Sequence, residues 1–304
     1  MKLRKRKKNS VEAILLSMPA LIVYSCVIIY PILSMFVTSF YEWNGVPDSP
    51  KIFVKFANYQ SFFTDYAAEY AMKNIGILMA AGLLCTIPIA FFLATVINKT
   101  FRGKRIFRVF YFMPVLVNRV AIGLMFTFIF FPEIGPVPVL LEQLHIAENV
   151  NLLGNVNPAM FTVAFVHVWC DVGFQMIILS SGMAALPGDV FEAAMLDGAT
   201  PWQKLRYITL PMMKGTLKIC VILVLTGSFK VFDLVMALTA GGPGNATQLP
   251  STLLYTAAFS QSKFGYANAI AVMTVLFCMC ITVIVNFIFK EKDEKRAKRR
   301  GGNS

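Results

Sequence analysis

The stretch FEAAMLDGATPWQKLRYITLP, residues 191–211, lies between two long apolar blocks, yet it carries acids, bases, a glycine and two prolines. The alanines and acids at its start predict one short helix that stops at Gly198, because glycine accepts the left-handed conformation that follows many helices. Thr200 and Gln203 have the spacing of a capping box and predict the start of a second helix, which we expect to end at Pro211. The stretch therefore predicts two short helices around a glycine turn.

Three explanations of this insert remain open from its residues alone. It could be a plain loop, an amphipathic pair lying on the membrane surface, or an element that docks into another protein. Ala193 and Ala194 give the first helix a small face beside the turn, and small residues allow another surface to approach closely. A short helix with an apolar patch suits a partner groove, so docking is the interpretation that we favour.

The chain around the insert is that of a membrane protein. Its 304 residues are 57% hydrophobic and only 14% charged, which is too apolar for a soluble globular domain. Its apolar residues form six blocks, each long enough for the roughly 20 residues that a helix needs to cross a bilayer. The blocks are too long and unbroken for the strands of a membrane barrel, so we predict an all-α integral membrane fold with six transmembrane helices. The blocks cover approximately residues 14–40, 73–97, 107–131, 159–183, 215–240 and 265–289.

The basic residues predict the orientation. Of the 28 Lys and Arg residues, 22 lie in the two tails, in the loop after the second block and in the insert with its edges, whereas four lie in the opposite loops. Because positive residues concentrate on the cytoplasmic side, both termini and the insert are expected in the cytoplasm. The net charge of +12 then reflects topology and contact with anionic lipid, and no nucleic-acid partner is predicted.

The sequence lacks the common motifs of nucleotide-binding and catalytic sites. The sequence has no G-x-x-x-x-G-K-[ST] phosphate loop, no H-E-x-x-H and no G-x-S-x-G, so we predict neither an enzyme nor a catalytic residue. The six cysteines lie within the apolar blocks without a C-x-x-C pair, and no metal site or cofactor is predicted. His145 is interpreted as a loop residue, and His167 as a packing or pathway residue rather than a metal ligand.

Four charged residues interrupt the apolar blocks: Arg119, Asp171, Lys230 and Asp233. Each costs about 2.5–3.5 kcal/mol on insertion scales, so each should face the bundle interior, a partner or water. On one helix Lys230 and Asp233 would share a face and could pair, and Asp171 and Gln175 would also share a face. Whether these five residues only neutralise one another or line a solute pathway stays open. The aromatic residues near them are Trp169, Phe174, Phe229 and Phe232.

The insert also fits a longer pattern, E-A-A-x-x-x-G followed by nine residues and then I-x-L-P. This pattern resembles the EAA loop of bacterial ABC importer permeases. The stretches FEAAMLDGA, FKVFDLVMALTAGGPG (229–244) and FGYANAIAVM (264–273) resemble the carbohydrate-uptake, maltose-type, binding-protein-dependent branch of that family. The likeness extends over nearly the whole chain in span count and loop order, and it is sharpest from about residue 169 to 273.

The resemblance implies a type I ABC importer permease fold and an ATP-driven importer of a sugar or oligosaccharide in a bacterial cell membrane. In that family the EAA loop seats in a cleft of a cytoplasmic ABC ATPase dimer, and a second, related permease completes the pathway as a heterodimer. An extracytoplasmic solute-binding protein delivers the cargo. ATP hydrolysis is then expected on a separate subunit, in keeping with the missing phosphate loop. The ATPase-coupling residues that the resemblance implies are Glu192, Ala193, Ala194, Asp197, Gly198, Ala199, Ile208, Leu210 and Pro211.

These observations predict a single transmembrane permease domain, residues 14–289, with the coupling loop at 187–211. A basic cytoplasmic tail is expected on each side of it, at residues 1–13 and 290–304.

The loop GGPGNATQLP, residues 241–250, is expected on the external side, where its glycines and prolines indicate tight turns. Gly241, Gly242 and Pro243 are the candidates for an external gate or a contact with the binding protein.

Two alternatives remain. The same architecture could import a non-sugar polar solute or a sugar phosphate. The intramembrane charges would also suit an autonomous ion-coupled secondary transporter, although that function leaves the insert unexplained.

Overall fold

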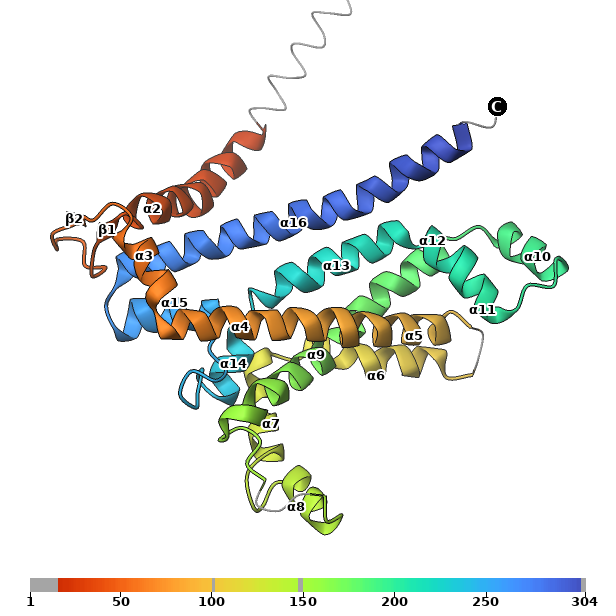
Figure 1. Ribbon diagram of the computed structural model, residues 1–304, viewed down its shortest axis with the longest axis horizontal. Coiled ribbons are helices and arrows are strands. Elements are labelled where there is room, and N and C mark those ends of the chain that lie inside the picture. The colour runs from red at the N-terminus through yellow and green to blue at the C-terminus, as the bar shows by residue number, and fades with distance from the viewer. Residues whose placement is uncertain (1–15, 100–101, 147–149, 302–304) are drawn as a thin grey trace, which may run out of the picture. The chain divides into compact units, whose positions relative to one another are not determined.

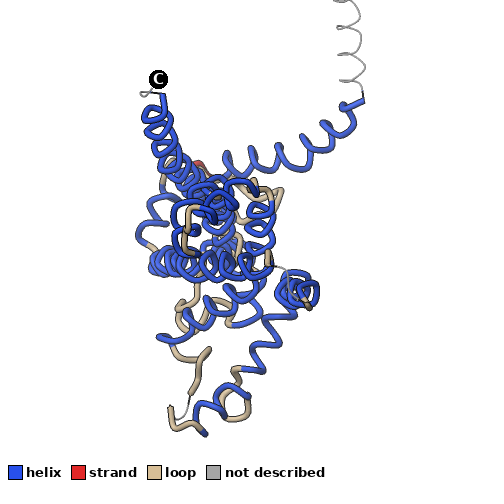
Figure 2. Tube along the Cα trace, turned by 90° about the vertical axis from the view of Figure 1, so that its right-hand side faces the viewer, coloured by secondary structure: helices blue, strands red, loops and turns tan. Residues whose placement is uncertain are grey.

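The computed structural model describes residues 16–99, 102–146 and 150–301, with side chains up to residue 290. The described chain is almost entirely helical (Figure 2), and its two short strands, β1 (Tyr41–Glu42) and β2 (Ile52–Phe53), pair antiparallel. This content confirms the predicted all-α fold. The α-helices are α2 (Tyr30–Thr38), α3 (Ala57–Thr64), α4 (Tyr66–Ala81), α5 (Ile87–Ile97), α6 (Lys104–Leu116), α7 (Arg119–Ile129), α8 (Pro136–Gln143), α9 (Val156–Ala184), α10 (Gly188–Leu196), α11 (Pro201–Gln203), α12 (Leu210–Met212), α13 (Lys214–Ser228), α14 (Asp233–Leu238), α15 (Pro250–Tyr255) and α16 (Phe264–Gly301). The π-helical segments are η1 (Ser25–Ile29), η2 (Gly82–Thr86), η3 (Lys204–Thr209) and η4 (Thr256–Ser260).

Four of the predicted spans are single long helices. The second begins at Tyr66 rather than at residue 73, because the Asp65 carboxylate accepts a hydrogen bond from the Ala67 N–H at 2.9 Å and so caps the helix earlier. Within the described residues, the helices long and apolar enough to cross a membrane alone are Leu16–Thr38, Tyr66–Ile97, Val156–Ala184 and Phe264–Lys290.

The third predicted span, 107–131, is not one straight helix. It is the pair α6 and α7, which meet at an angle of 98°. Val117 is extended, and the Asn118 side chain accepts a hydrogen bond from the Val120 N–H at 2.8 Å, so a new helix begins there.

The fifth predicted span, 215–240, is wrong as one helix. The segment Pro201–Met212 precedes α13 at an angle of 70°, α13 ends at Ser228, and the chain starts a separate helix, α14, at Asp233. Lys230 lies in the break between α13 and α14. Because a charged side chain in hydrocarbon is costly, a helix end at this point allows Lys230 to reach polar surroundings. Counting each bent pair as one span raises the number of candidate spans in the described chain from four to six.

The two predicted tails remain predictions. Residues 1–13 lie outside the described residues. In the C-terminal tail, the backbone of α16 continues past residue 290 to Gly301.

The described chain divides into two compact units. The first runs from its N-terminal end to Thr64 and includes Leu254–Met273. In it, the Asn58 side chain donates hydrogen bonds to the carbonyls of Ser39 and Tyr41 at 2.8 and 3.0 Å, which ties α3 to the segment leading into β1.

The second unit comprises Asp65–Leu253 and the chain from Thr274 onward, and α9 is its central helix. α9 contacts α4, α5, α6, α13 and α14 (Figure 1), and 61% of its most apolar stretch is buried. Two buried apolar clusters lie along α9, one where α7 and α14 meet it and one where α5 and α13 meet it. Both broken helices, the α6–α7 pair and the α13–α14 pair, therefore pack against α9.

α6 and α9 cross closely at Gly173. A Cβ atom added at Gly173 would run into the carbonyl oxygen of Tyr111, and small residues are what lets membrane helices approach in this way. We expect Gly173→Ala to lower the free energy of unfolding by about 1–3 kcal/mol, because a backbone carbonyl cannot rotate aside. Thermal unfolding in detergent measures the loss.

Gly215→Ala on α13 is the matched control. A Cβ at Gly215 meets no described atom within 4 Å, so this variant should be unchanged or more stable by up to about 1 kcal/mol. Equal destabilisation of both variants would contradict the close crossing as the cause.

Candidate functional site

The EAA loop, residues 187–211, folds as two short helices around a tight turn, as predicted. Gly198 has a φ of +73°, the left-handed conformation expected after α10. The predicted capping box is complete: the Gln203 N–H donates to Thr200 Oγ1 at 3.3 Å, and the Thr200 N–H donates to Gln203 Oε1 at 2.7 Å. The second helix does not end at Pro211, because the continuous helical run of α11, η3 and α12 extends to Met212.

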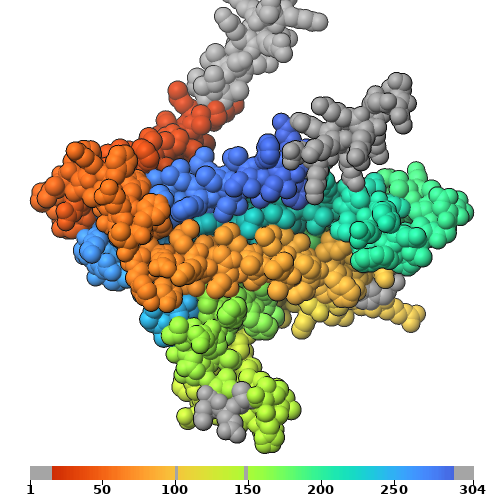
Figure 3. Space-filling model, in the orientation of Figure 1, coloured from red at the N-terminus to blue at the C-terminus, as the bar shows by residue number. Residues whose placement is uncertain are grey.

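The EAA loop presents large apolar side chains at the surface of the second unit. Leu196 is 90% exposed, Tyr207 70% and Trp202 65%. The space-filling view shows the segment, in green, protruding at one end of that unit (Figure 3). Of the nine predicted coupling residues, Ala194 is buried, Ala199, Ile208 and Pro211 are half-buried, and Glu192, Ala193, Asp197, Gly198 and Leu210 are exposed.

Within the second unit, the EAA loop lies at the same end as the connection between α5 and α6 (Figure 1). α7, α8 and α14 lie toward the other end. The EAA loop and the α5–α6 connection, both predicted to be cytoplasmic from their basic residues, therefore lie at the same end of the second unit.

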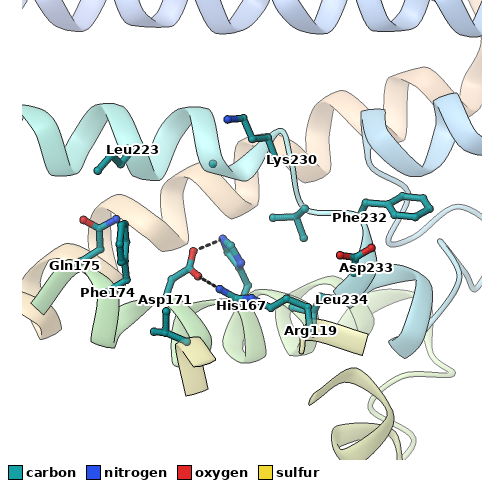
Figure 4. A pocket seen from close by; sticks show the side chains of 13 residues that line it. Arg119, His167, Asp171, Phe174, Gln175, Leu223, Lys230, Phe232, Asp233 and Leu234 are labelled. Carbon is teal, nitrogen blue, oxygen red and sulfur yellow. Dashed lines mark hydrogen bonds and ion pairs between the residues drawn. The ribbon is translucent and has the colours of Figure 1, made fainter. Parts of the chain in front are cut away.

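A cavity of about 290 Å³ lies in the second unit, between α9 and the two helix breaks (Figure 4). All five predicted pathway residues line it, although they come from three separate segments of the chain. The lining consists of Val115, Arg119, His167, Asp171, Phe174, Gln175, Leu223, Gly227, Lys230, Val231, Phe232, Asp233 and Leu234.

Arg119 and Asp171 form an ion pair in this cavity, with Nη2 and Oδ1 2.5 Å apart. The other carboxylate oxygen of Asp171 lies 3.5 Å from Nε2 of His167. The side chains of Arg119 and Asp171 are 32% and 27% exposed, and that of His167 is 8% exposed. Arg119 is the first residue of α7, so the pair fastens the break between α6 and α7 to the middle of α9.

Lys230 and Asp233 do not share a helix face, contrary to the prediction. Lys230 follows the end of α13, whereas Asp233 opens α14. Both residues are exposed and line the cavity, and no ion pair joins them in the described structure. Figure 4 shows the Lys230 side chain directed away from Asp171.

Gln175 lies one helical turn beyond Asp171 and is 3% exposed. Among the described residues, its Oε1 and Nη1 of Arg119 are the buried side-chain polar atoms that lack a hydrogen-bond partner. Of the aromatic candidates, Phe174 and Phe232 line the cavity, but Trp169 packs edge-on against Phe126 and Phe229 is buried.

His167, interpreted from the sequence as a packing or pathway residue, lines the cavity. The available signal was its spacing of four residues from Asp171, which puts both on one face of α9. The part of the chain that the structure describes holds no group of three or more His, Cys, Asp or Glu that could bind a metal ion.

The candidate gate residues Gly241, Gly242 and Pro243 lie in a closely held loop rather than a loose one. Thr247, fully buried, donates a hydrogen bond to the Gly242 carbonyl at 2.8 Å. Gly241 has a φ of +86°, and a Cβ atom added there would run into the side chain of Gln248. The loop is therefore held by hydrogen bonds and leaves no room for a side chain at Gly241.

Asn74 anchors this loop from α4. Its side-chain amide is buried and donates hydrogen bonds to the carbonyls of Ala246 and Gln248, each at 2.9 Å. We expect Asn74→Asp to lower the free energy of unfolding by about 1–3 kcal/mol, because a carboxylate would face two carbonyls with no donor. Thermal unfolding in detergent tests this.

Asn44→Asp is the control for that substitution. The Asn44 side chain acts through its oxygen, which accepts from the Val46 N–H and the Ser49 hydroxyl, and Asp keeps both bonds. A similar loss of stability in both variants would show that the Asn74 donors are not the cause.

Comparison with known proteins supplies an independent observation. The family model described as "Binding-protein-dependent transport system inner membrane component" matches residues 86–293. The chain is 31% identical to the probable ABC transporter permease protein YurN of Bacillus subtilis, over 95% of this chain and 99% of that protein. It is 26% identical to the probable starch degradation products transport system permease protein AmyD of Thermoanaerobacterium thermosulfurigenes, over 94% and 96%.

Among solved structures, the fold is similar to a chain of a bacterial ABC transporter involved in the import of the acidic polysaccharide alginate. The TM-score is 0.82 at 20% sequence identity, and the match covers 96% of this chain and 99% of that chain.

Proposed function

Because this chain belongs to the family of binding-protein-dependent transport system inner membrane components, we propose that it is the permease subunit of an ATP-driven importer whose cargo is a sugar or oligosaccharide. The observation that carries this function is the EAA loop, a preformed two-helix element with an exposed apolar surface. The absence of a phosphate loop from the sequence supports an ATPase on a separate subunit.

The EAA loop is proposed as the element that docks on that ATPase and couples its movement to this chain. The left-handed Gly198 fixes the angle between α10 and α11, and the capping box holds the second helix in register. Leu196 and Trp202 then project as apolar anchors of the kind that fill a partner groove. An ATPase dimer that closes on ATP would move this rigid element, and with it the helix breaks around the cavity.

The cavity is proposed as this subunit's part of the translocation pathway, completed by a second homologous permease. Its charged lining requires water or a polar solute, since charges in hydrocarbon are costly. The Gly241–Pro243 loop, held through Thr247, is proposed as the external gate or the contact with a solute-binding protein.

The proposed location is a bacterial cell membrane with both termini and both basic tails in the cytoplasm. The shared position of the EAA loop and the α5–α6 connection at one end of the second unit supports this orientation (Figure 1).

The sugar cargo is supported by likeness to permeases such as AmyD, whose description refers to starch degradation products. A non-sugar polar solute or a sugar phosphate would use the same architecture, and is the alternative.

Co-purification tests the assembly. The full chain is expressed with the products of the genes next to its own, and the bound proteins are identified by mass spectrometry. An ATPase and a second permease should be recovered with it in stable amounts. Recovery of this chain alone, as a stable protein that takes up solute under an ion gradient without ATP, would overturn the proposal.

A further inference from the structure

We infer that the exposed side of α6 binds an anionic phospholipid. Arg105 and Arg108 hold the headgroup, and the apolar side chains that follow them along the helix contact an acyl chain. The inference goes beyond the proposed import function and needs only the membrane location of the family to which the chain belongs. The arginines lie outside both the cavity lining and the EAA loop.

The two sides of α6 have opposite surroundings. α6 packs against α5 and α9 (Figure 1), and Phe107 and Tyr111 join the buried apolar cluster that these helices form with α13. On the other side, the exposed fractions are 61% for Val109, 51% for Met113 and 74% for Leu116. The second side is therefore left uncovered by the described chain and is available to lipid or to a partner.

Basic and apolar residues follow one another along this exposed side. One row on the helix, with spacings of four, four and three residues, contains Arg105, Val109, Met113 and Leu116. Arg108 lies next to Arg105 on the helix surface, three residues further along, and both arginines are exposed. The row is thus cationic at the end of α6 nearest α5 in the chain and apolar toward the bend into α7.

The cations at the start of α6 lack an acidic counterpart in the described structure. Among the residues that it describes, no ion pair involves Lys104, Arg105 or Arg108. The sequence contains no Asp or Glu between Glu69 and Glu133. Cations in the first turn also oppose the helix dipole, so they do not stabilise α6 itself. Membrane orientation requires positive charge in this loop, but it does not require the charge to be aligned with an apolar row.

A phospholipid matches both parts of the row. Its phosphate is an anion that arginine binds through charge-assisted hydrogen bonds, and clustered cations beside a membrane span attract such headgroups. From Arg105 to Leu116 a helix rises about 16 Å, which is close to half of the about 30 Å hydrocarbon core and so to the depth of one leaflet. An ATPase in the cytoplasm could reach the arginines but not the apolar part of the row.

Lipid binding by the purified full-length chain in detergent tests the inference. The probes are phosphatidylglycerol, phosphatidylcholine with the same acyl chains, and inorganic phosphate as an anion without acyl chains. Native mass spectrometry over a series of lipid concentrations gives each Kd. We expect phosphatidylglycerol to bind at least about tenfold more tightly than phosphatidylcholine, and millimolar inorganic phosphate to leave it bound.

Variants of the two arginines assign the binding to α6. Arg105→Gln combined with Arg108→Gln should raise the Kd of phosphatidylglycerol about 10- to 30-fold and leave that of phosphatidylcholine unchanged. Arg105→Lys combined with Arg108→Lys should restore most of the affinity, because the charge is kept. Lys55→Gln combined with Lys263→Gln removes two exposed cations from the first unit, and this matched control should change neither Kd.

Three outcomes would overturn the inference. They are equal affinity of the native chain for the two lipids, an unchanged Kd in a folded Arg105→Gln, Arg108→Gln chain, and displacement of phosphatidylglycerol by inorganic phosphate. Loss of the ATPase or of the second permease from that variant, with lipid binding unaltered, would also overturn it, because the arginines would then serve a protein partner. ATP-driven import is tested separately by the co-purification, so either proposal can fail without the other.

Discussion

Import is expected to fall by at least about 30-fold when Glu192 in α10 is replaced by Lys, while the protein stays folded. Glu192 is exposed in the EAA loop, and loss of one partner of an interfacial charge pair costs about 2 kcal/mol or more. The free energy of unfolding should change by less than about 0.5 kcal/mol, as for other surface substitutions. The measurements are cargo uptake by cells that carry the whole transporter, and thermal unfolding of the purified chain.

Glu142→Lys on α8 is the control, since it reverses an exposed acid outside the EAA loop and should leave uptake unchanged. If Glu192→Lys transports normally, Glu192 plays no part in coupling.

A second pair of variants separates the shape of the loop from its charge. Gly198→Val should also lose import, because a β-branched residue in the left-handed conformation costs about 1–2 kcal/mol and would distort the turn. Gly198→Asn should retain most of it, because Asn tolerates that conformation. Equal loss in both would mean that the open surface at Gly198, rather than its backbone angle, is what the partner needs.

The largest expected loss of stability is at Asp171. Asp171→Leu should lower the free energy of unfolding by about 2–4 kcal/mol, because Arg119 would keep its charge without a counter-ion. This expected loss is smaller than the loss of about 3–5 kcal/mol that breaking a fully buried ion pair causes, because both side chains are partly exposed.

The double variant Arg119→Met with Asp171→Leu is the decisive comparison. Removing both charges leaves no uncompensated ion, so most of the lost stability should return. Chemical unfolding in detergent gives the free energies of the single and double variants. A double variant no more stable than Asp171→Leu would show that the ion pair is not what holds α7 to α9.

Local features of this protein could be predicted because they depend on residues close together in the chain. The turn at Gly198 and the capping box of Thr200 with Gln203 form within a few residues, and both are confirmed. The long apolar helices follow from the same kind of information, because a helix satisfies its own backbone hydrogen bonds within the bilayer.

The two helix breaks could not be predicted from residues close together in the chain. Both predicted spans that contain them are apolar throughout most of their length, and apolar composition does not distinguish a straight helix from a bent one. The break at Asn118 depends on a side-chain cap, and the break after Ser228 on where α13 and α14 pack against the rest of the second unit.

The candidate site also combines features that the sequence predicted with features that depend on tertiary packing. The sequence alone identified intramembrane charges that need polar surroundings, since a charge in hydrocarbon is costly wherever it lies. It suggested a partner for Lys230 three residues away, and that pairing does not occur. Asp171 instead pairs with Arg119, 52 residues earlier, and Asn74 holds carbonyls more than 170 residues later. Only the packing of α4, α7 and α14 around α9 brings such distant residues within bonding distance, because contacts of that range depend on the whole arrangement of helices rather than on any local pattern.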